Sequence, residues 1–251
     1  SNIHSKCLSI ILSSMELITH TPLAFSRKGF PRDGEGKPYL PGDIFKEAFT
    51  SAVIFHSIKR DKSLENRVKK YLTTKGLKLE EIAQEVKRIV FEKYPLLENL
   101  QIPEKIYLPE EKIYTERIEI LDLKKKRDVD HFKTELFKGT LEVDISVPER
   151  LKSACHSYAE ALAHMERNFL REHPLGELFY EELLNEIKHW EIPLRLGLWT
   201  EVHFKGDLLF FWKIKEVREF LIKELGIDIR PRYVLYLPKE NVTVGWAELR
   251  K

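Results

Sequence analysis

Lys37-Pro38-Tyr39-Leu40-Pro41-Gly42-Asp43 runs directly into an apolar-periodic segment that ends at Arg60. The two prolines hold the backbone extended, the glycine permits a sharp turn, and Asp43 is expected to cap the first amide groups of a helix. The segment from Ile44 to Arg60 places its bulky apolar side chains largely on one side, as an amphipathic helix does. We therefore expect a strand or loop that leads into a helix around which much of the chain packs.

The composition indicates a globular chain with a local binding surface. Its 251 residues are 43% hydrophobic, enough for a substantial core. Lys and Arg number 42 and Asp and Glu 40, so the net charge of +2 requires that any nucleic-acid site be a local basic patch. Two cysteines indicate no disulfide framework and fit a reducing cytosol. The apolar runs are far shorter than the roughly 20 residues that span a bilayer, and we expect a soluble, cytoplasmic protein.

Patterns along the chain predict one domain over residues 1–251 of the α+β class. An antiparallel sheet with helices packed on it, of the ferredoxin-like kind, fits the order of strands and helices. Four consecutive cations begin the run Lys124 to Asp128, which we expect to be a turn or a disordered loop. The other expected elements are a first strand at 7–19, a helical insertion at about 63–100, strands at 113–123 and 133–147, a helical C-terminal lobe at about 149–225 and a terminal hairpin at 230–249.

Metal and cofactor chemistry has little support. His156, Glu160 and His164 share one helix face, where they could hold zinc. The same face continues with Arg167 and Arg171, which repel a cation, so we interpret it as a solvated surface. The chain lacks a nucleophile elbow, a Walker loop and a dinucleotide fingerprint. We expect neither a metal nor a cofactor.

A glycine-containing loop before the helix combines cations with aromatic side chains. Cations neutralise phosphates and aromatic faces stack on unpaired bases, which together recognise single-stranded RNA. A charged surface loop with its aromatics in the core is the alternative, and the loop's chemistry alone leaves both open. The residues concerned are Arg27, Lys28, Arg32, Lys37, Phe25, Phe30 and Tyr39.

The segment Phe30 to Phe49, FPRDGEGKPYLPGDIFKEAF, resembles the RAMP proteins of CRISPR effector complexes. In that family a hydrophobic-Arg-Asp element, a short turn and Pro-Tyr-Ile-Pro-Gly lead into a Ser-Ser-Leu-Lys-Gly-Ala-Leu helix. Lys46 occupies the family's lysine position, and Glu47 replaces its glycine. The resemblance implies a RAMP fold, which is a modified ferredoxin-like (RRM-like) domain.

Later stretches are similar to the fifth, backbone-capping subunit of the type III-A Csm complex. They include Ala159 to Leu170, PLRLG at 193–197, and the ending from Pro231 through VGWAEL at 244–249. The resemblance implies an RNA-binding subunit that contacts the 3′ part of the guide RNA (crRNA) and caps the backbone filament in antiviral defence. It also implies two neighbours, the backbone RAMP subunit and the small subunit. The RNA-binding residues expected are Arg27, Lys28, Arg32, Lys37, Tyr39, Lys46, Arg195 and Lys205.

Two departures from the family matter. Subunits that cut target RNA carry an aspartate six residues before the position of Asp33, and this chain has Arg27 there, so we expect no catalysis. After Gly197 the family has further glycines, whereas this chain continues with Leu198 and Trp199. Side chains therefore stand where the family has bare backbone, and we do not expect that loop to approach RNA backbone closely.

Two other classes of function stay open. The first is a metal-independent RAMP endoribonuclease that processes CRISPR transcripts. In that enzyme His20 or His56 would be the base, Tyr39 its partner, and Lys46 or Lys59 would stabilise the developing charge. The second is a purely structural protein whose basic loop meets an acidic protein surface.

Overall fold

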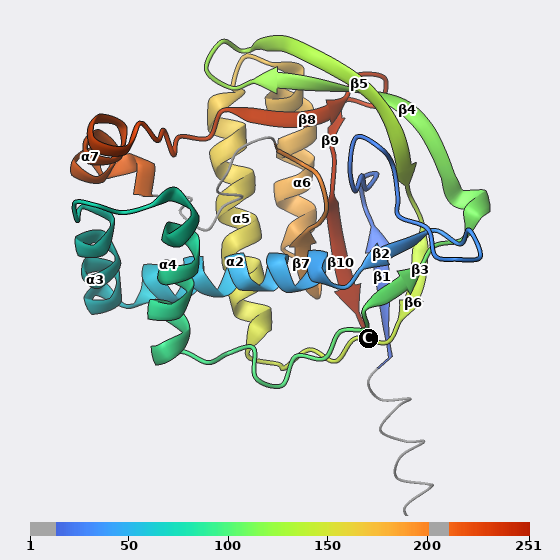
Figure 1. The fold of residues 1–251 in the computed structure, drawn as a ribbon. Coiled ribbons are helices and arrows are strands. Elements are labelled where there is room, and N and C mark those ends of the chain that lie inside the picture. Colours follow the sequence, from blue (N-terminus) through green and yellow to red (C-terminus); the bar gives the residue numbers. More distant parts are fainter. Residues whose placement is uncertain (1–13, 201–210) are drawn as a thin grey trace, which may run out of the picture.

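The computed structural model describes residues 14–200 and 211–251, and Figure 1 shows the fold. Two four-stranded sheets, a two-stranded ribbon and several helices make up this part of the chain. The strands are β1 (Met15–Thr19), β2 (Tyr39–Pro41), β3 (Lys105–Tyr107), β4 (Ile113–Asp122), β5 (Arg127–Phe137), β6 (Thr140–Val143), β7 (Ile192–Arg195), β8 (Tyr233–Leu237), β9 (Val242–Thr243) and β10 (Trp246–Arg250). The helices are α2 (Asp43–Arg60), α3 (Lys62–Leu72), α4 (Leu79–Lys93), α5 (Leu151–Phe169), α6 (Tyr180–Ile187) and α7 (Lys215–Leu225), with short helical turns η1 (Glu110–Lys112), η2 (Leu175–Phe179) and η3 (Phe211–Lys213).

The sheets are antiparallel, as expected for the predicted α+β class. The first has the strand order β6-β1-β10-β7, and the second has the order β5-β4-β8-β9. The ribbon pairs β2 with β3. α5 packs against α2, α6 and β7, so it joins the first sheet to the other helices. The buried apolar side chains form one contiguous cluster. No helix in the described ranges is both long and apolar enough to cross a membrane.

Helix α2 has almost the predicted bounds, but its start differs from the prediction. Gly42 is the N-cap residue, and the Asp43 side chain makes no capping hydrogen bond. The Gly42 amide donates to the Glu104 carbonyl at 2.9 Å, and a Cβ on Gly42 would lie 2.1 Å from the Pro103 carbonyl oxygen. Close packing of the backbone against the segment that enters β3 therefore sets the start of α2.

Two helices, α3 and α4, lie in the region where we expect a helical insertion, and Asp61 ties them together. Its carboxylate caps α3 by accepting from the Leu64 amide at 3.0 Å. It also accepts from the Tyr94 hydroxyl at 2.5 Å and lies 2.6 Å from Lys93 Nζ, at the end of α4. The Lys93 ammonium, and next the Tyr94 hydroxyl, hold the pKa of Asp61 well below its usual range.

Two strand pairings differ from the sequence-based expectation. The run after β4 is a tight turn, and Arg127 and Asp128 already belong to β5, so the β4–β5 hairpin is longer than predicted. The closing hairpin expected at 230–249 consists of β8 and β9 only. Gly245, at φ +92°, redirects the chain, and β10 enters the other sheet between β1 and β7. A Cβ at Gly245 would lie 2.5 Å from the Leu196 carbonyl oxygen.

Candidate nucleic-acid interface

The basic loop before β2 is tied down by its own charges. The Arg32 guanidinium lies 2.8 Å from Glu110 Oε1 and 3.1 Å from Glu135 Oε2. Glu135 also accepts the Phe30 amide at 3.0 Å, and the Phe30 ring is buried. Arg32 and Phe30 therefore fix the loop on β5. They are poorly placed for the phosphate and base contacts that the sequence suggested.

The other predicted cations of the loop lie nearer to solvent. The Arg27 guanidinium is 4.5 Å from the centroid of the Phe132 ring on β5. Lys28 is exposed, and Lys37 Nζ lies 3.4 Å from Glu35 in an exposed pair. Asp33 closes the turn by accepting the amides of Glu35 and Lys37, and these bonds, that of Lys37 first, lower its pKa.

The ribbon of β2 and β3 presents aromatic rings on its solvent side. Leu40 and Ile106 point into the core, so the alternation of a strand places Tyr39, Tyr107 and Lys105 on the opposite face. The two tyrosine rings are 6.2 Å apart at 65°, and Lys105 Nζ lies 5.1 Å from the Tyr39 ring centre. Tyr107 is 49% exposed, which is unusual for so large a ring.

Tyr107 and Lys105 belong to the candidate interface by their position, and the sequence did not single them out. Alternation in the tripeptide Lys105-Ile106-Tyr107 was the available signal, but the pairing with Tyr39 joins segments more than 60 residues apart. A hydrogen bond between the Tyr107 hydroxyl and Asp33, followed by partial burial, raises the pKa of Tyr107. The Asp33 carboxylate thereby links Tyr107 on the ribbon to the basic loop, whose turn it closes.

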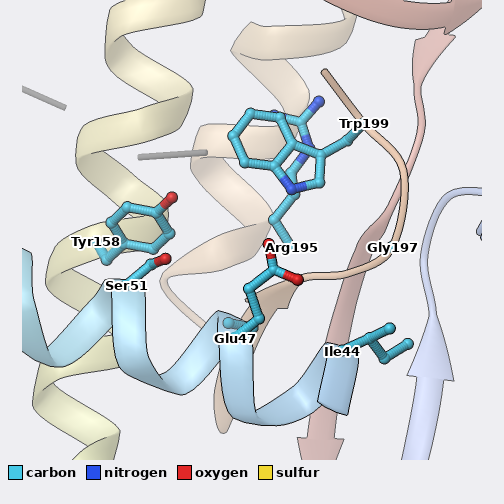
Figure 2. Close-up of a pocket in the computed structure, with 8 residues that line it drawn as sticks. Ile44, Glu47, Ser51, Tyr158, Arg195, Gly197 and Trp199 are labelled. Atoms are coloured by element: carbon cyan, nitrogen blue, oxygen red, sulfur yellow. The ribbon is translucent and has the colours of Figure 1, made fainter. Parts of the chain in front are cut away.

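Arg195, also a predicted RNA contact, lies beside a small cavity between α2, α5 and the segment after β7 (Figure 2). It is 4% exposed, and its guanidinium lies between the rings of Trp199 and Trp246, at 4.4 and 4.3 Å. Its Nη2 atom has no hydrogen-bond partner in the part of the chain that the structure describes. The cavity is lined by Ile44, Glu47, Ala48, Ser51, Tyr158, Arg195, Gly197 and Trp199.

A buried polar network holds Arg195 in this position. Its Nη1 lies 2.8 and 3.0 Å from the two oxygens of Glu166 on α5, and its Nε donates to the Val244 carbonyl at 3.0 Å. The Tyr180 hydroxyl donates to Glu166 at 2.5 Å and lies 3.2 Å from the Thr243 hydroxyl. Burial, and next the Glu166 carboxylate, raise the pKa of Tyr180 well above its usual value. Arg195 therefore positions the segment after β7.

Gly197 approaches the chain's own backbone. It has φ +75°, and a Cβ there would lie 2.0 Å from the Ala24 carbonyl oxygen. That carbonyl accepts the Leu198 amide at 2.8 Å. A glycine is thus required at 197, because this segment contacts the chain just before the basic loop. The Ala24 carbonyl covers the side of Gly197 on which a Cβ would lie.

The remaining predicted residues are dispersed. Lys46 is exposed on the first turns of α2, 3.9 Å from Asp43. His56, ten residues further along α2, is about 15 Å away along the helix axis, and burial, followed by Arg60 and Lys59, lowers its pKa. His20 Nε2 lies 3.0 Å from Glu248 Oε1, and its ring stacks on Trp190 at 4.1 Å. The predicted RNA contact Lys205 lies outside the described residues.

The helix face considered for zinc does not gather ligands. His156 Nε2 lies 3.1 Å from the Glu191 carbonyl oxygen. Burial lowers the pKa of His164, with Arg167 as the next contributor. Within residues 14–200 and 211–251, no three His, Cys, Asp or Glu side chains form a group that could hold a metal ion.

Sequence comparison finds a close relative without a described activity. The chain is 43% identical over 241 residues to an uncharacterized protein of Aquifex aeolicus (strain VF5), covering 94% of this chain and 99% of that protein. The chain belongs to the family of this Aquifex protein. No family model matches the sequence.

Comparison of structures finds the fold of the family in a ribonucleoprotein. One chain in the cryo-EM structure of a Csm–crRNA–target RNA ternary complex of a type III-A CRISPR-Cas system matches with a TM-score of 0.57. The match covers 87% of this chain and 74% of that chain at 13% sequence identity. At this identity the match shows a shared fold.

Proposed function

We propose that this chain is a non-catalytic RNA-binding subunit of a type III CRISPR effector complex. The observation that carries the proposal is the fold match, over 87% of the chain, to a chain of a Csm–crRNA–target RNA complex. In finer terms, the chain is a RAMP domain of the modified ferredoxin-like kind and serves as the fifth, capping subunit. Its partners are the 3′ part of the guide RNA, the backbone RAMP subunit and the small subunit.

The solvent face of the β2–β3 ribbon supplies the chemistry for RNA. Tyr107 and Tyr39 offer ring faces on which unpaired bases stack, and Lys105 and Lys28 offer exposed ammonium groups for phosphates. Arg32 contributes indirectly, because its pairs with Glu110 and Glu135 hold the loop in place. Stacking on an aromatic ring and charge contacts to phosphates do not distinguish one base from another. Such a surface can therefore bind guide RNAs of different sequence.

The position of Arg27 supports binding without cleavage. A cutting RAMP subunit carries an aspartate at this position, whereas here a guanidinium lies over the Phe132 ring. An arginine cannot hold a metal ion or accept a proton at neutral pH. The RNA is therefore bound and left uncut at this place.

Filter binding of a guide RNA tests the proposal. The Tyr39→Ala/Tyr107→Ala double variant is expected to bind at least about tenfold more weakly, because each stacked base contributes about 1–3 kcal/mol. Tyr71→Ala, which removes a half-buried ring from α3, serves as the matched control and should bind like the wild type. Wild-type affinity in the double variant would place the RNA elsewhere. Absence of any RNA binding by the wild type would contradict the proposed function itself.

One observation favours a metal-independent endoribonuclease as the second candidate. His20 lies 3.0 Å from the buried carboxylate of Glu248, and such a carboxylate can orient an imidazole that acts as a base. Incubation of a repeat-containing CRISPR transcript with the protein in EDTA separates the two. Cleavage that is lost in His20→Ala would replace the binding function with the enzyme, whereas intact RNA would remove this candidate.

A further inference from the structure

Four consecutive cations join β4 to β5: Lys124, Lys125 and Lys126 form the turn, and Arg127 is the first residue of β5. All four are exposed. In Figure 1 the hairpin arches across the top of the molecule, whereas the β2–β3 ribbon lies at its lower right. The turn is therefore a separate surface from the ribbon and the basic loop.

The turn is held in one conformation by a buried carboxylate. Asp122 is 1% exposed, and its Oδ1 accepts the amides of Lys124 and Lys125 at 2.8 and 2.9 Å. Its Oδ2 lies 3.2 Å from Arg232 Nε on the segment before β8, and its carbonyl accepts the Lys126 amide at 2.7 Å. Lys126 adopts φ +55°, which closes the turn. The four cations are thus presented by a fixed backbone.

The acidic residues close to the turn are engaged within the fold. Asp128 accepts the Tyr236 hydroxyl at 2.7 Å, and Asp228 pairs with Arg230 at 2.5 Å. Asp130 accepts the amide of the next residue at 2.8 Å. Of the carboxylates that the structure describes, none forms an ion pair with any of the four cations of the turn. Their charge is available to a partner.

We infer that the β4–β5 turn is a second RNA contact, which binds the sugar-phosphate backbone without reading bases. This inference rests on the proposed function and adds a surface to it. RNA fits because it carries one phosphate per nucleotide, so several closely spaced cations can be neutralised at once. The turn itself carries no aromatic ring for stacking. It binds by charge, and the ribbon binds by stacking.

The salt dependence of RNA binding tests this inference. The full chain is titrated with a fluorescein-labelled uridine 30-mer between 50 and 300 mM salt, where each phosphate contact on a single strand contributes about 0.7 to the slope of log K against log salt. Replacement of all four cations by glutamine should lower the slope by about 3 and the affinity at low salt by about tenfold or more. Replacement of the three lysines by arginine should preserve both values.

A variant with the same charge change elsewhere is the control. Lys70, Lys75, Lys78 and Lys87 are exposed on or between α3 and α4, and their change to glutamine should leave the slope nearly unaltered. An equal loss in both variants would indicate a general charge effect and overturn the inference. An unchanged slope in the folded turn variant, checked by thermal unfolding, would overturn it while leaving RNA binding at the ribbon intact. Failure of the wild type to bind the 30-mer would overturn both proposals.

Discussion

Arg195 shows how one residue type can serve a purpose other than the one its sequence context suggested. Its place two residues before a glycine at a strand end predicts an RNA contact. Its side chain instead lies between two tryptophan rings and pairs with Glu166. Of its three guanidinium nitrogens, only Nη2 has no hydrogen-bond partner in the described chain. The burial of Arg195 depends on Glu166 and Trp246, which are distant in sequence. The local sequence around Arg195 therefore could not predict that its side chain is buried.

The buried pair provides a stability prediction. Glu166→Ala should lower the free energy of unfolding by about 3–5 kcal/mol, because it leaves the guanidinium of Arg195 charged and buried without its counter-charge. The double variant Glu166→Leu/Arg195→Met should recover most of this loss, since apolar side chains of similar size need no partner. Urea unfolding measures both. A loss below about 1 kcal/mol for Glu166→Ala would mean that the pair is hydrated in solution.

At the scale of elements, the segment after β7 depends on one glycine. Gly197→Ala should destabilise the protein by at least about 2 kcal/mol more than Gly226→Ala, which is a matched control at the end of α7. Both glycines have positive φ, but a Cβ at Gly226 would meet nothing within 4 Å, whereas at Gly197 it would collide with the Ala24 carbonyl. Thermal and urea unfolding of the two variants make the comparison. Equal losses would show that the Ala24 segment moves aside.

The sequence predicts the helices better than it predicts which strands pair with one another. The bounds of α2 and the helical character of the region that forms α3 and α4 follow from apolar spacing, which is a local property. The place of β10 depends on Gly245 and on β1, more than 220 residues away, so the sequence reading paired it with the wrong strand. The ribbon had the same difficulty, since Tyr107 becomes a site residue only through its pairing with Tyr39.

At the scale of the whole molecule, the insertion belongs to the main core. Apolar side chains of α3 and α4, among them Leu64, Val68, Ile82 and Val86, are buried in the same cluster as α2. Replacing residues 62–93 with a short Gly-Ser linker should therefore expose one side of α2 and prevent cooperative unfolding, because the cluster loses a large share of its apolar contacts.

Circular dichroism and binding of a hydrophobic dye measure this outcome. Insertion of four Gly-Ser residues at Gly76, in the open turn between α3 and α4, is the control and should leave the melting curve nearly unchanged. A deletion variant that still melts in one sharp transition would show that the insertion is an independent unit.

The position of β1 between β6 and β10 makes the first sheet late to complete during synthesis. β1 lies between β6 and β10, and its pairing with β10 joins Glu16 to Arg250. A nascent chain on the ribosome therefore carries β1 with one edge unpaired until β10, more than 220 residues later in the sequence, has been made. Contacts of such long sequence separation slow folding and leave an open strand edge exposed to other chains. We expect the first sheet to be completed only after β10 has emerged from the ribosome, and chaperones to matter most before that point.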